Sequence, residues 1–375
     1  MTAQVKPTNE RLVAIDFIRG VAVFFLAVVH TLWMYADIAT QGESWLGHAV
    51  HFLGKCTCAF LMCMGISMAF SRRRSVMALF TRGCLLFGAG TFMNFMKFNV
   101  PILAGTMPET FINAYGWNSP VSAAQHVYLI STGDILQLAG ASLFIMAIFQ
   151  RWLTNVTFLA GLTLVITVLS RELSGVSIPY LTYVGEILFG GNYHVYFPVF
   201  PWMSFILAGL IIGQLIRDRG DHVTLFNRCL SIGVVAAVIG IGLMVFNFKY
   251  HFGNFFHLGP GGVVYMMGFS LIVLWVVHKQ VENIQLPRLY AATLYLSKRV
   301  TSVYLIQWIL ICWGMGVVGY QTLNLWQTLA VMPVVLALTF ATQYGLDLIM
   351  ARVRKPKSTN NTGDKNTNSA ELEAS

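Results

Sequence analysis

The chain has 375 residues, of which 56% are hydrophobic and only 10% are charged, and its formal net charge is +9. Because a soluble domain is typically about a quarter charged, this composition excludes an ordinary soluble enzyme and indicates a polytopic membrane protein. The excess of basic residues does not indicate a nucleic-acid partner, because the sequence has neither a Gly-rich phosphate loop nor an array of aromatic and basic residues.

Apolar segments of the length that a bilayer requires, about 20 residues, recur along most of the chain. In chain order we expect spans at residues 13–35, 46–70, 77–97, 127–150, 153–170, 195–216, 226–248, 262–278, 300–319 and 326–350. The sequence therefore predicts an all-α polytopic membrane protein with about ten transmembrane helices.

We expect three parts along the chain. Residues 1–12 form a cytoplasmic N-terminal segment, and the long apolar run that follows is an anchor rather than a cleavable signal peptide. Residues 13–350 form the transmembrane domain. Residues 351–375 form a tail that is first basic and then disordered, because its last part is polar and almost without apolar residues.

The distribution of positive charge predicts the orientation. If the N-terminus is inside, the outer segments hold only Lys97, Arg171 and Lys249, and the other Lys and Arg residues, apart from Lys55 within a span, fall on the cytoplasmic side. This asymmetry follows the positive-inside rule, so both termini are expected in the cytoplasm, with the protein in the plasma (inner) membrane. Arg82 and Asp347 lie near the inner edge and are interpreted as anchors.

The first predicted span carries two chargeable residues, Arg19 and His30. Eleven positions separate them, so on a helix they lie about 16 Å apart along the axis and face the same way. Asp16 lies three residues before Arg19, which suggests an Asp–Arg pair. An ionisable group at the depth of His30 usually faces a cavity or a partner. The alternative interpretations are a neutral histidine bonded to a neighbouring helix and a snorkelling arginine.

Two further segments place polar residues inside spans. In "WLGHAVHFLGK", His48, His51 and Lys55 follow the spacing of one helix face. In "STGDILQLAG", Asp134 and Gln137 are three residues apart. Polar groups thus approach the membrane centre from both sides.

Three functions are compatible with this pattern. The first is an enzyme that takes a donor from one side of the membrane and an acceptor from the other. The second is a transporter with a His/Asp/Lys relay, which the lack of self-similarity between residues 1–170 and 195–350 disfavours. The third, a non-catalytic scaffold, leaves Arg19 and His30 unexplained.

The cysteines do not indicate a site. All six lie in or beside apolar segments and lack the spacing of a metal site or a disulfide framework. They are interpreted as packing residues, and no metal is expected.

The opening "RLVAIDFIRGVAVFFLAVVH" resembles the integral-membrane acyltransferase superfamily, which includes acyltransferase-3 and heparan-α-glucosaminide N-acetyltransferase-like proteins. The shared pattern is a basic residue, ten intervening residues and a histidine. "DFIRG", "GDILQLAGASL" (133–143) and "FPVFPWMSFILAGLIIG" (197–213) look more like the glucosaminide branch. "FLMCMGISMAFSRR" (60–73) resembles both branches, and "LYLSKRVTSVYLIQWIL" (294–310) resembles a late segment with glycine, arginine, serine, tyrosine and histidine.

Two positions depart from the family pattern. Gln307 stands where a histidine is common, and Ser297-Lys298-Arg299 where a glycine is common. The glucosaminide branch also carries a histidine before the first outer "SWNG"-like stretch, whereas "GESWLG" has Glu43 there and no histidine. His30 is therefore the better catalytic candidate.

The resemblance implies transfer of an acetyl or another short acyl group from cytoplasmic acyl-CoA, a co-substrate rather than a bound cofactor. His30 would act as general base or as covalent carrier, together with Arg19 and Asp16. Asp134 or Glu43 would orient the imidazole. The expected cations for the CoA phosphates are Arg19, Arg72, Arg73, Arg74 and Arg82.

The same resemblance implies an acceptor that enters from outside, either an envelope glycan or a lipid-linked sugar. The expected acceptor-side residues are Glu43, His48, His51, Lys55, Asp134, Gln137 and Trp202. The bilayer and acyl-CoA are the other expected partners, and a homo-oligomer is left open.

Overall fold

The computed structural model describes residues 12–71, 74–283 and 286–354. Within these ranges the regular structure is helical, and the only β-type contacts are two isolated bridges, Ala36 with Leu323 and Gly133 with Val195. The predicted all-α membrane fold is therefore confirmed.

Eight segments of the described chain are long and apolar enough to cross a membrane. Two of them are interrupted: α3 (Trp45–Gly54) continues into α4 (Thr57–Ala69), and α5 (Val76–Asn94) continues through a π-helical turn, η1 (Phe95–Asn99), into α6 (Val100–Leu103). The others lie in α1 (Val13–Tyr35), α12 (Val199–Arg219), α13 (His222–Phe246), α15 (Pro260–Asn283), α17 (Val300–Val318) and α18 (Leu325–Arg354).

Two shorter apolar helices occupy the places of the predicted fourth and fifth spans. They are α9 (Ile135–Ile148) and α10 (Val156–Val168), with 14 and 13 residues. At 1.5 Å per residue each is about 20 Å long, less than a hydrocarbon core of about 30 Å. The predicted span 127–150 is wrong in its boundaries, because residues 131–134 separate α8 (Ala123–Ile130) from α9.

Short helices connect the long ones. They are α2 (Ile38–Glu43), α7 (Glu109–Ala114), η2 (Gln150–Trp152), α11 (Thr182–Phe189), α14 (Phe248–Phe252) and α16 (Pro287–Ser297). The cytoplasmic placement of both termini and the division into three parts stay predictions. Residues 1–11 and 355–375 lie outside the described residues.

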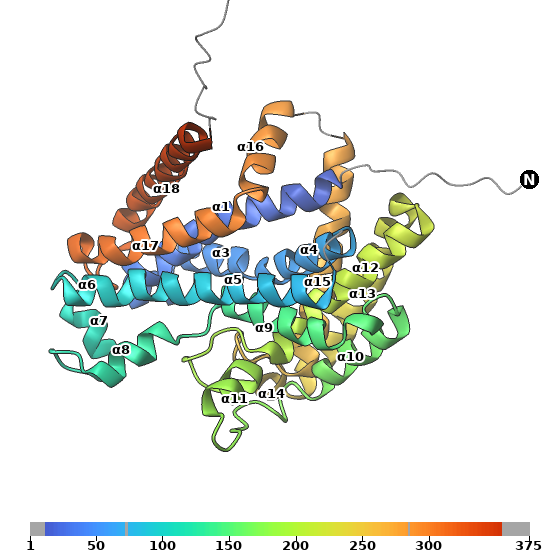
Figure 1. Ribbon diagram of the computed structural model, residues 1–375, viewed down its shortest axis with the longest axis horizontal. Helices are drawn as coiled ribbons and strands as arrows, with labels where there is room; N and C mark the ends of the chain where they lie inside the picture. The colour runs from blue at the N-terminus through green and yellow to red at the C-terminus, as the bar shows by residue number, and fades with distance from the viewer. Residues whose placement is uncertain (1–11, 72–73, 284–285, 355–375) are drawn as a thin grey trace, which may run out of the picture.

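Helix α1 is central to the arrangement. It contacts α3, α4, α15, α16, α17 and α18. Figure 1 shows α1 and α5 running through the middle of the molecule, with α6, α7 and α8 at one end, α12 and α13 toward the other, and α16 at the top. Different residues along α1 can therefore contribute to sites near either end of this helix.

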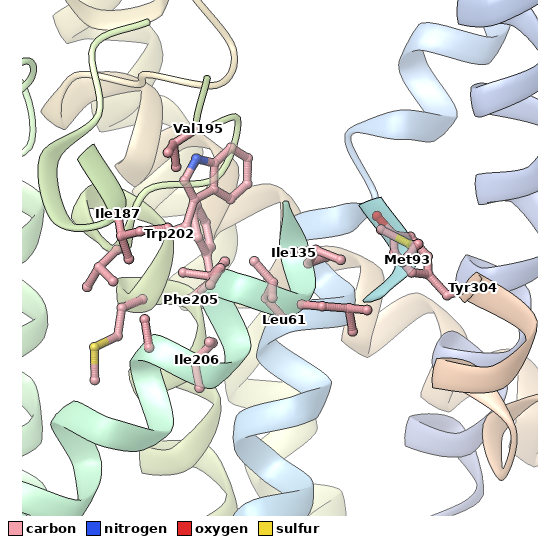
Figure 2. Close-up of a cluster of buried hydrophobic side chains, with 14 of the residues drawn as sticks. Leu61, Met93, Ile135, Ile187, Val195, Trp202, Phe205, Ile206 and Tyr304 are labelled. Carbon is pink, nitrogen blue, oxygen red and sulfur yellow. The ribbon is translucent and has the colours of Figure 1, made fainter. Parts of the chain in front are cut away.

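The hydrophobic core gathers around α12. Figure 2 shows Trp202 among Val195, Ile187 and Phe205, while Tyr304 and Met93 lie together at the far side of the cluster. Trp202 is fully buried, and its indole N–H donates a hydrogen bond of 2.7 Å to the carbonyl oxygen of Phe256. Trp202 is therefore packed within the core, and its predicted place on the acceptor side stays a prediction.

Close contact between α4 and α12 depends on glycine. A Cβ at Gly65 would overlap the carbonyl of Ile206, one at Gly209 the carbonyl of Met62, and one at Gly213 the side chain of Ala69. Small residues four positions apart allow two membrane helices to pack backbone against backbone.

We predict that Gly209→Ala destabilises the protein, because the added methyl group must separate α12 from α4. Overpacking of this kind costs about 1–3 kcal/mol. The matched control is Gly88→Ala on α5, where a Cβ meets nothing within 4 Å; there the higher helix propensity of alanine leaves stability equal or up to about 1 kcal/mol greater. The two variants are compared by thermal unfolding in detergent. Equal melting temperatures would contradict the packing argument.

Candidate functional site

A cavity of about 750 Å³, called here the central cavity, lies between α1, the break between α3 and α4, η1, the start of α9 and α17. Its polar and charged lining residues are His30, Gln41, His51, Lys55, Thr57, Lys97, Thr132, Asp134 and Gln321. Its aromatic lining residues are Trp33, Phe98, Phe111, Tyr115, Tyr128, Tyr193, Tyr196, Phe197, Phe255, Phe256, Tyr304, Trp308 and Tyr320. The cavity is large enough for a small ligand.

His30 forms part of the wall and is 4% exposed. Its ring stacks on Trp308 with centroids 3.9 Å apart and meets Tyr304 edge-on at 5.7 Å. Its Nδ1 has no hydrogen-bond partner among the described residues. The imidazole is thus held by aromatic packing, which leaves that nitrogen available to a ligand or to water.

Lys97 is the charged residue that the sequence analysis placed wrongly. It does not lie in an outer loop but in η1, where it is 2% exposed. Its Nζ lies 3.6 Å from the Asp134 carboxylate, which is also buried. A buried charge requires such a partner. Asp134 therefore balances Lys97 rather than orienting His30.

The position of Asp134 follows from the start of α9. Its carboxylate accepts a hydrogen bond of 2.7 Å from the N–H of Ile135, and the Gln137 side chain accepts one of 3.1 Å from the N–H of Asp134. This is a capping box, and it accounts for the positions of two of the predicted acceptor-side residues, Asp134 and Gln137. The Asn94 side chain donates to the carbonyl of Thr132 at 2.6 Å, which ties the same loop to α5.

Trp308 connects the ion pair to His30. The Lys97 ammonium lies 4.3 Å from the centroid of the Trp308 indole, the ring on which His30 stacks. A cation over an indole face is attracted by its quadrupole. The ion pair, the indole and the imidazole therefore form one contiguous unit on the cavity wall.

Tyrosines on the loops complete the wall. Burial raises the pKa of Tyr115 and of Tyr196, so both phenols stay neutral. Tyr128 stacks on His194 at 4.0 Å, and His194 Nδ1 lies 2.7 Å from the Glu186 carboxylate. The three tyrosines belong to the mainly aromatic lining of the central cavity.

The predicted His/Lys stripe is divided by the structure. His51 and Lys55 line the cavity, and the Trp33 indole N–H donates to His51 Nδ1 at 3.4 Å. His48 and Glu43 are exposed and do not belong to the lining. Glu43 therefore does not orient His30.

A second cavity of about 490 Å³, called here the Arg19 pocket, lies where α1, the α16–α17 junction and α18 meet. Arg19, Lys298 and Arg299 line it. The predicted Asp16–Arg19 ion pair is not formed; the Asp16 carboxylate accepts a hydrogen bond of 2.6 Å from the Ser297 hydroxyl instead.

Asp347 neutralises one of the three cations of the Arg19 pocket. Its carboxylate binds Arg299 Nε at 2.7 Å and accepts hydrogen bonds from Tyr295 and Gln343. Arg19 and Lys298 form no ion pair with a described residue. The pocket is therefore net positive, as an anion-binding site requires.

Two of the other predicted phosphate-binding cations, Arg74 and Arg82, lie elsewhere. Arg74 donates to the carbonyl of Ser71 at 2.9 Å and lies near Arg217 and Asp218. Arg82 is half-buried on α5, and neither it nor Arg74 lines the Arg19 pocket. Arg72 and Arg73 lie outside the described residues.

Lys97, Tyr304 and Trp308 are the wall residues that the sequence analysis missed. The sequence did contain one sign of a polar site here, because "NFMKFN" places Asn94, Lys97 and Asn99 in one otherwise apolar segment. Within the described ranges, no group of three or more His, Cys, Asp or Glu residues is placed to hold a metal ion.

We predict that Lys97→Met lowers the melting temperature more than the double variant Lys97→Met/Asp134→Asn does. The single variant leaves a buried carboxylate unpaired, which costs about 3–5 kcal/mol, whereas the double variant removes both charges and keeps a capping side chain. Thermal unfolding of the two variants and of Asp134→Asn completes the cycle. Additive effects would contradict a direct ion pair.

The family described as heparan-alpha-glucosaminide N-acetyltransferase, catalytic, matches residues 11–245, which is more than half of the chain. The protein therefore belongs to this family. A comparison with individual curated proteins gives no match. The matched region contains Arg19, His30, Lys97 and Asp134.

Proposed function

We propose that this member of the heparan-alpha-glucosaminide N-acetyltransferase catalytic family moves an acetyl or another short acyl group from cytoplasmic acyl-CoA to a hydroxyl or amine of an envelope glycan or a lipid-linked sugar. The observation that carries the proposal is that α1 contributes a wall residue to each of two cavities. Arg19 lines the net positive one and His30 the aromatic one, eleven residues further along the helix.

The positive charge of the Arg19 pocket supports this pocket as the binding site of the donor. The phosphates of CoA need cations that are not already paired, and Arg19 and Lys298 have no ion-pair partner in the part of the chain that the structure describes. Because a guanidinium binds phosphate oxygens in pairs, Arg19 is the stronger of the two. The acyl end then extends along α1 toward His30.

The two cavities are separated by packed side chains. Val23 on α1 and Val303 on α17 are fully buried and lie in sequence between the residues that line the two cavities. The pantetheine arm must displace such residues to bring the thioester to His30. Donor binding is therefore coupled to a local movement between α1 and α17.

Two routes of transfer involve His30. As a general base it takes the proton from the acceptor hydroxyl or amine, which attacks the thioester carbonyl; the C–S bond breaks, and the thiolate receives the proton. As a nucleophile it first forms an acyl-imidazole and releases CoA, and the acceptor then attacks this intermediate. Lys97 lies on the same wall, where its positive charge would stabilise an oxyanion.

We predict that His30→Asn abolishes transfer but leaves acetyl-CoA binding unchanged, because His30 lies outside the Arg19 pocket. His30→Phe preserves the stacking on Trp308 and must be equally inactive. Transfer is measured with radiolabelled acetyl-CoA, and binding by thermal shift in nanodiscs. Rapid quenching then shows whether an acetylated protein precedes product. An active His30→Phe variant would refute the catalytic role.

We predict that Arg19→Gln weakens acetyl-CoA binding by about 10- to 100-fold, because a hydrogen bond to a charged group contributes about 1.5–3 kcal/mol. Arg82→Gln is the matched control, since it removes a half-buried arginine outside the pocket. Equal losses in both variants would assign donor binding to a general basic surface rather than to the Arg19 pocket.

The alternative function is transport through an alternating-access cycle. The two separate cavities favour it, because such a cycle also needs a closed partition between two sides. The acetyl-transfer assay and an uptake assay in sealed vesicles distinguish the two functions. A transporter accumulates its substrate unmodified in the vesicles and forms no acetylated product.

A further inference from the structure

A narrow apolar groove runs beside α1 and has no part in the chemistry described above. It has a volume of about 160 Å³ and is lined on α1 by Phe17, Val21 and Phe25 and on α15 by Val273 and Val277. Its lining is almost entirely apolar. The groove meets the central cavity at Leu26 and Thr57, which line both.

Lys55 lies at this junction. Leu53 and Cys56 line the groove, Gly54 and Lys55 line the central cavity, and Thr57 lines both. Lys55 therefore lies in the segment that the two cavities share. Gly54 faces Val29 of α1, which places the segment at the level of His30.

Lys55 is an uncompensated charge in a predicted span. It is half-buried, and its side chain forms no ion pair or hydrogen bond with a described residue; its ammonium lies 5.8 Å from the centroid of the Phe252 ring. Asp134, the acidic residue of the cavity wall, is already paired with Lys97. A cation at this depth normally faces a partner or a ligand.

The order of these features along α1 matches the order of groups in one class of ligand. From Phe17 to Leu26 the helix borders the apolar groove, over about 13 Å. Lys55 follows at the level of Val29, then His30, and then the aromatic wall that begins at Trp33. An amphiphile with a hydrocarbon tail, a phosphate and a sugar presents its groups in the same order.

Resting on the proposed function, we propose that the acceptor is a sugar joined through phosphate to a lipid tail. The tail lies in the groove beside α1, Lys55 binds the phosphate, and the sugar enters the aromatic cavity with a hydroxyl or amine at His30. A soluble glycan uses neither the groove nor the lysine, and a sugar phosphate without a tail does not use the groove.

The test compares three probes in neutral phosphatidylcholine nanodiscs with radiolabelled acetyl-CoA. They are a polyprenyl-phosphoryl-glucosamine, the same polyprenyl glucosaminide without phosphate, and glucosamine 1-phosphate. We expect the first to be acetylated at least about tenfold more efficiently than either of the others. Equal use of the three probes would overturn the proposal.

Two variants test where the phosphate and the lipid tail of the acceptor bind. Lys55→Met is expected to abolish the preference for the phosphate-bearing lipid, and Val273→Trp, which fills the groove, is expected to abolish the preference for the lipid-bearing probes. The controls are Lys249→Met, an exposed lysine outside both cavities, and Val276→Trp, an exposed valine of α15 outside the groove. If Lys55→Met still prefers the phosphate-bearing lipid, Lys55 does not bind the phosphate. If Val273→Trp still prefers the lipid-bearing probes, the groove does not bind the tail.

Acetyl-CoA binding is measured in parallel, because it does not depend on Lys55 or on the groove. If the donor binds but none of the probes is acetylated, the lipid-phosphate acceptor is refuted whether or not His30 is labelled, and the donor site stands. If the donor neither binds nor reacts, the proposed function fails, and the acceptor proposal fails with it.

Discussion

The buried ion pair between Lys97 and Asp134 is the interaction on which the site depends. Neither charge is stable alone at this depth, so the two segments that carry them must meet. Asp134 also caps α9, and its loop is held to α5 by Asn94. A lysine inside the membrane needs a carboxylate as its ion-pair partner, and this requirement fixes where α9 begins.

The same ion pair shapes the environment of His30. Lys97 reaches Asp134 from a π-helical turn, a distortion that redirects side chains within a helix and often occurs at functional sites. From there its ammonium lies over Trp308, and the face of Trp308 holds the imidazole. The catalytic candidate is therefore positioned through aromatic contacts with a charged unit, and not by a carboxylate of its own.

The features that could be predicted from the sequence are those with a local cause. The apolar segments and the shared face of Arg19 and His30 follow from helical periodicity. The three-residue spacing of Asp134 and Gln137 also contained a capping signal, and the cap accounts for the shortened fourth apolar helix. Lys97 and Trp308 could not be paired from the sequence, because 210 residues separate them and their contact depends on how η1 packs against α17.

Charge balance connects the two ligand surfaces. Asp347 neutralises Arg299, and Asp134 neutralises Lys97, so both carboxylates are used for structure. Arg19 and Lys298 in one cavity and Lys55 in the other have no acidic partner among the described residues. Unpaired cations persist at such positions only where water or an anion reaches them. The pairing pattern therefore supports both proposals, in which an anionic group binds at each end, the CoA phosphates on the donor side and a phosphate linker on the acceptor side.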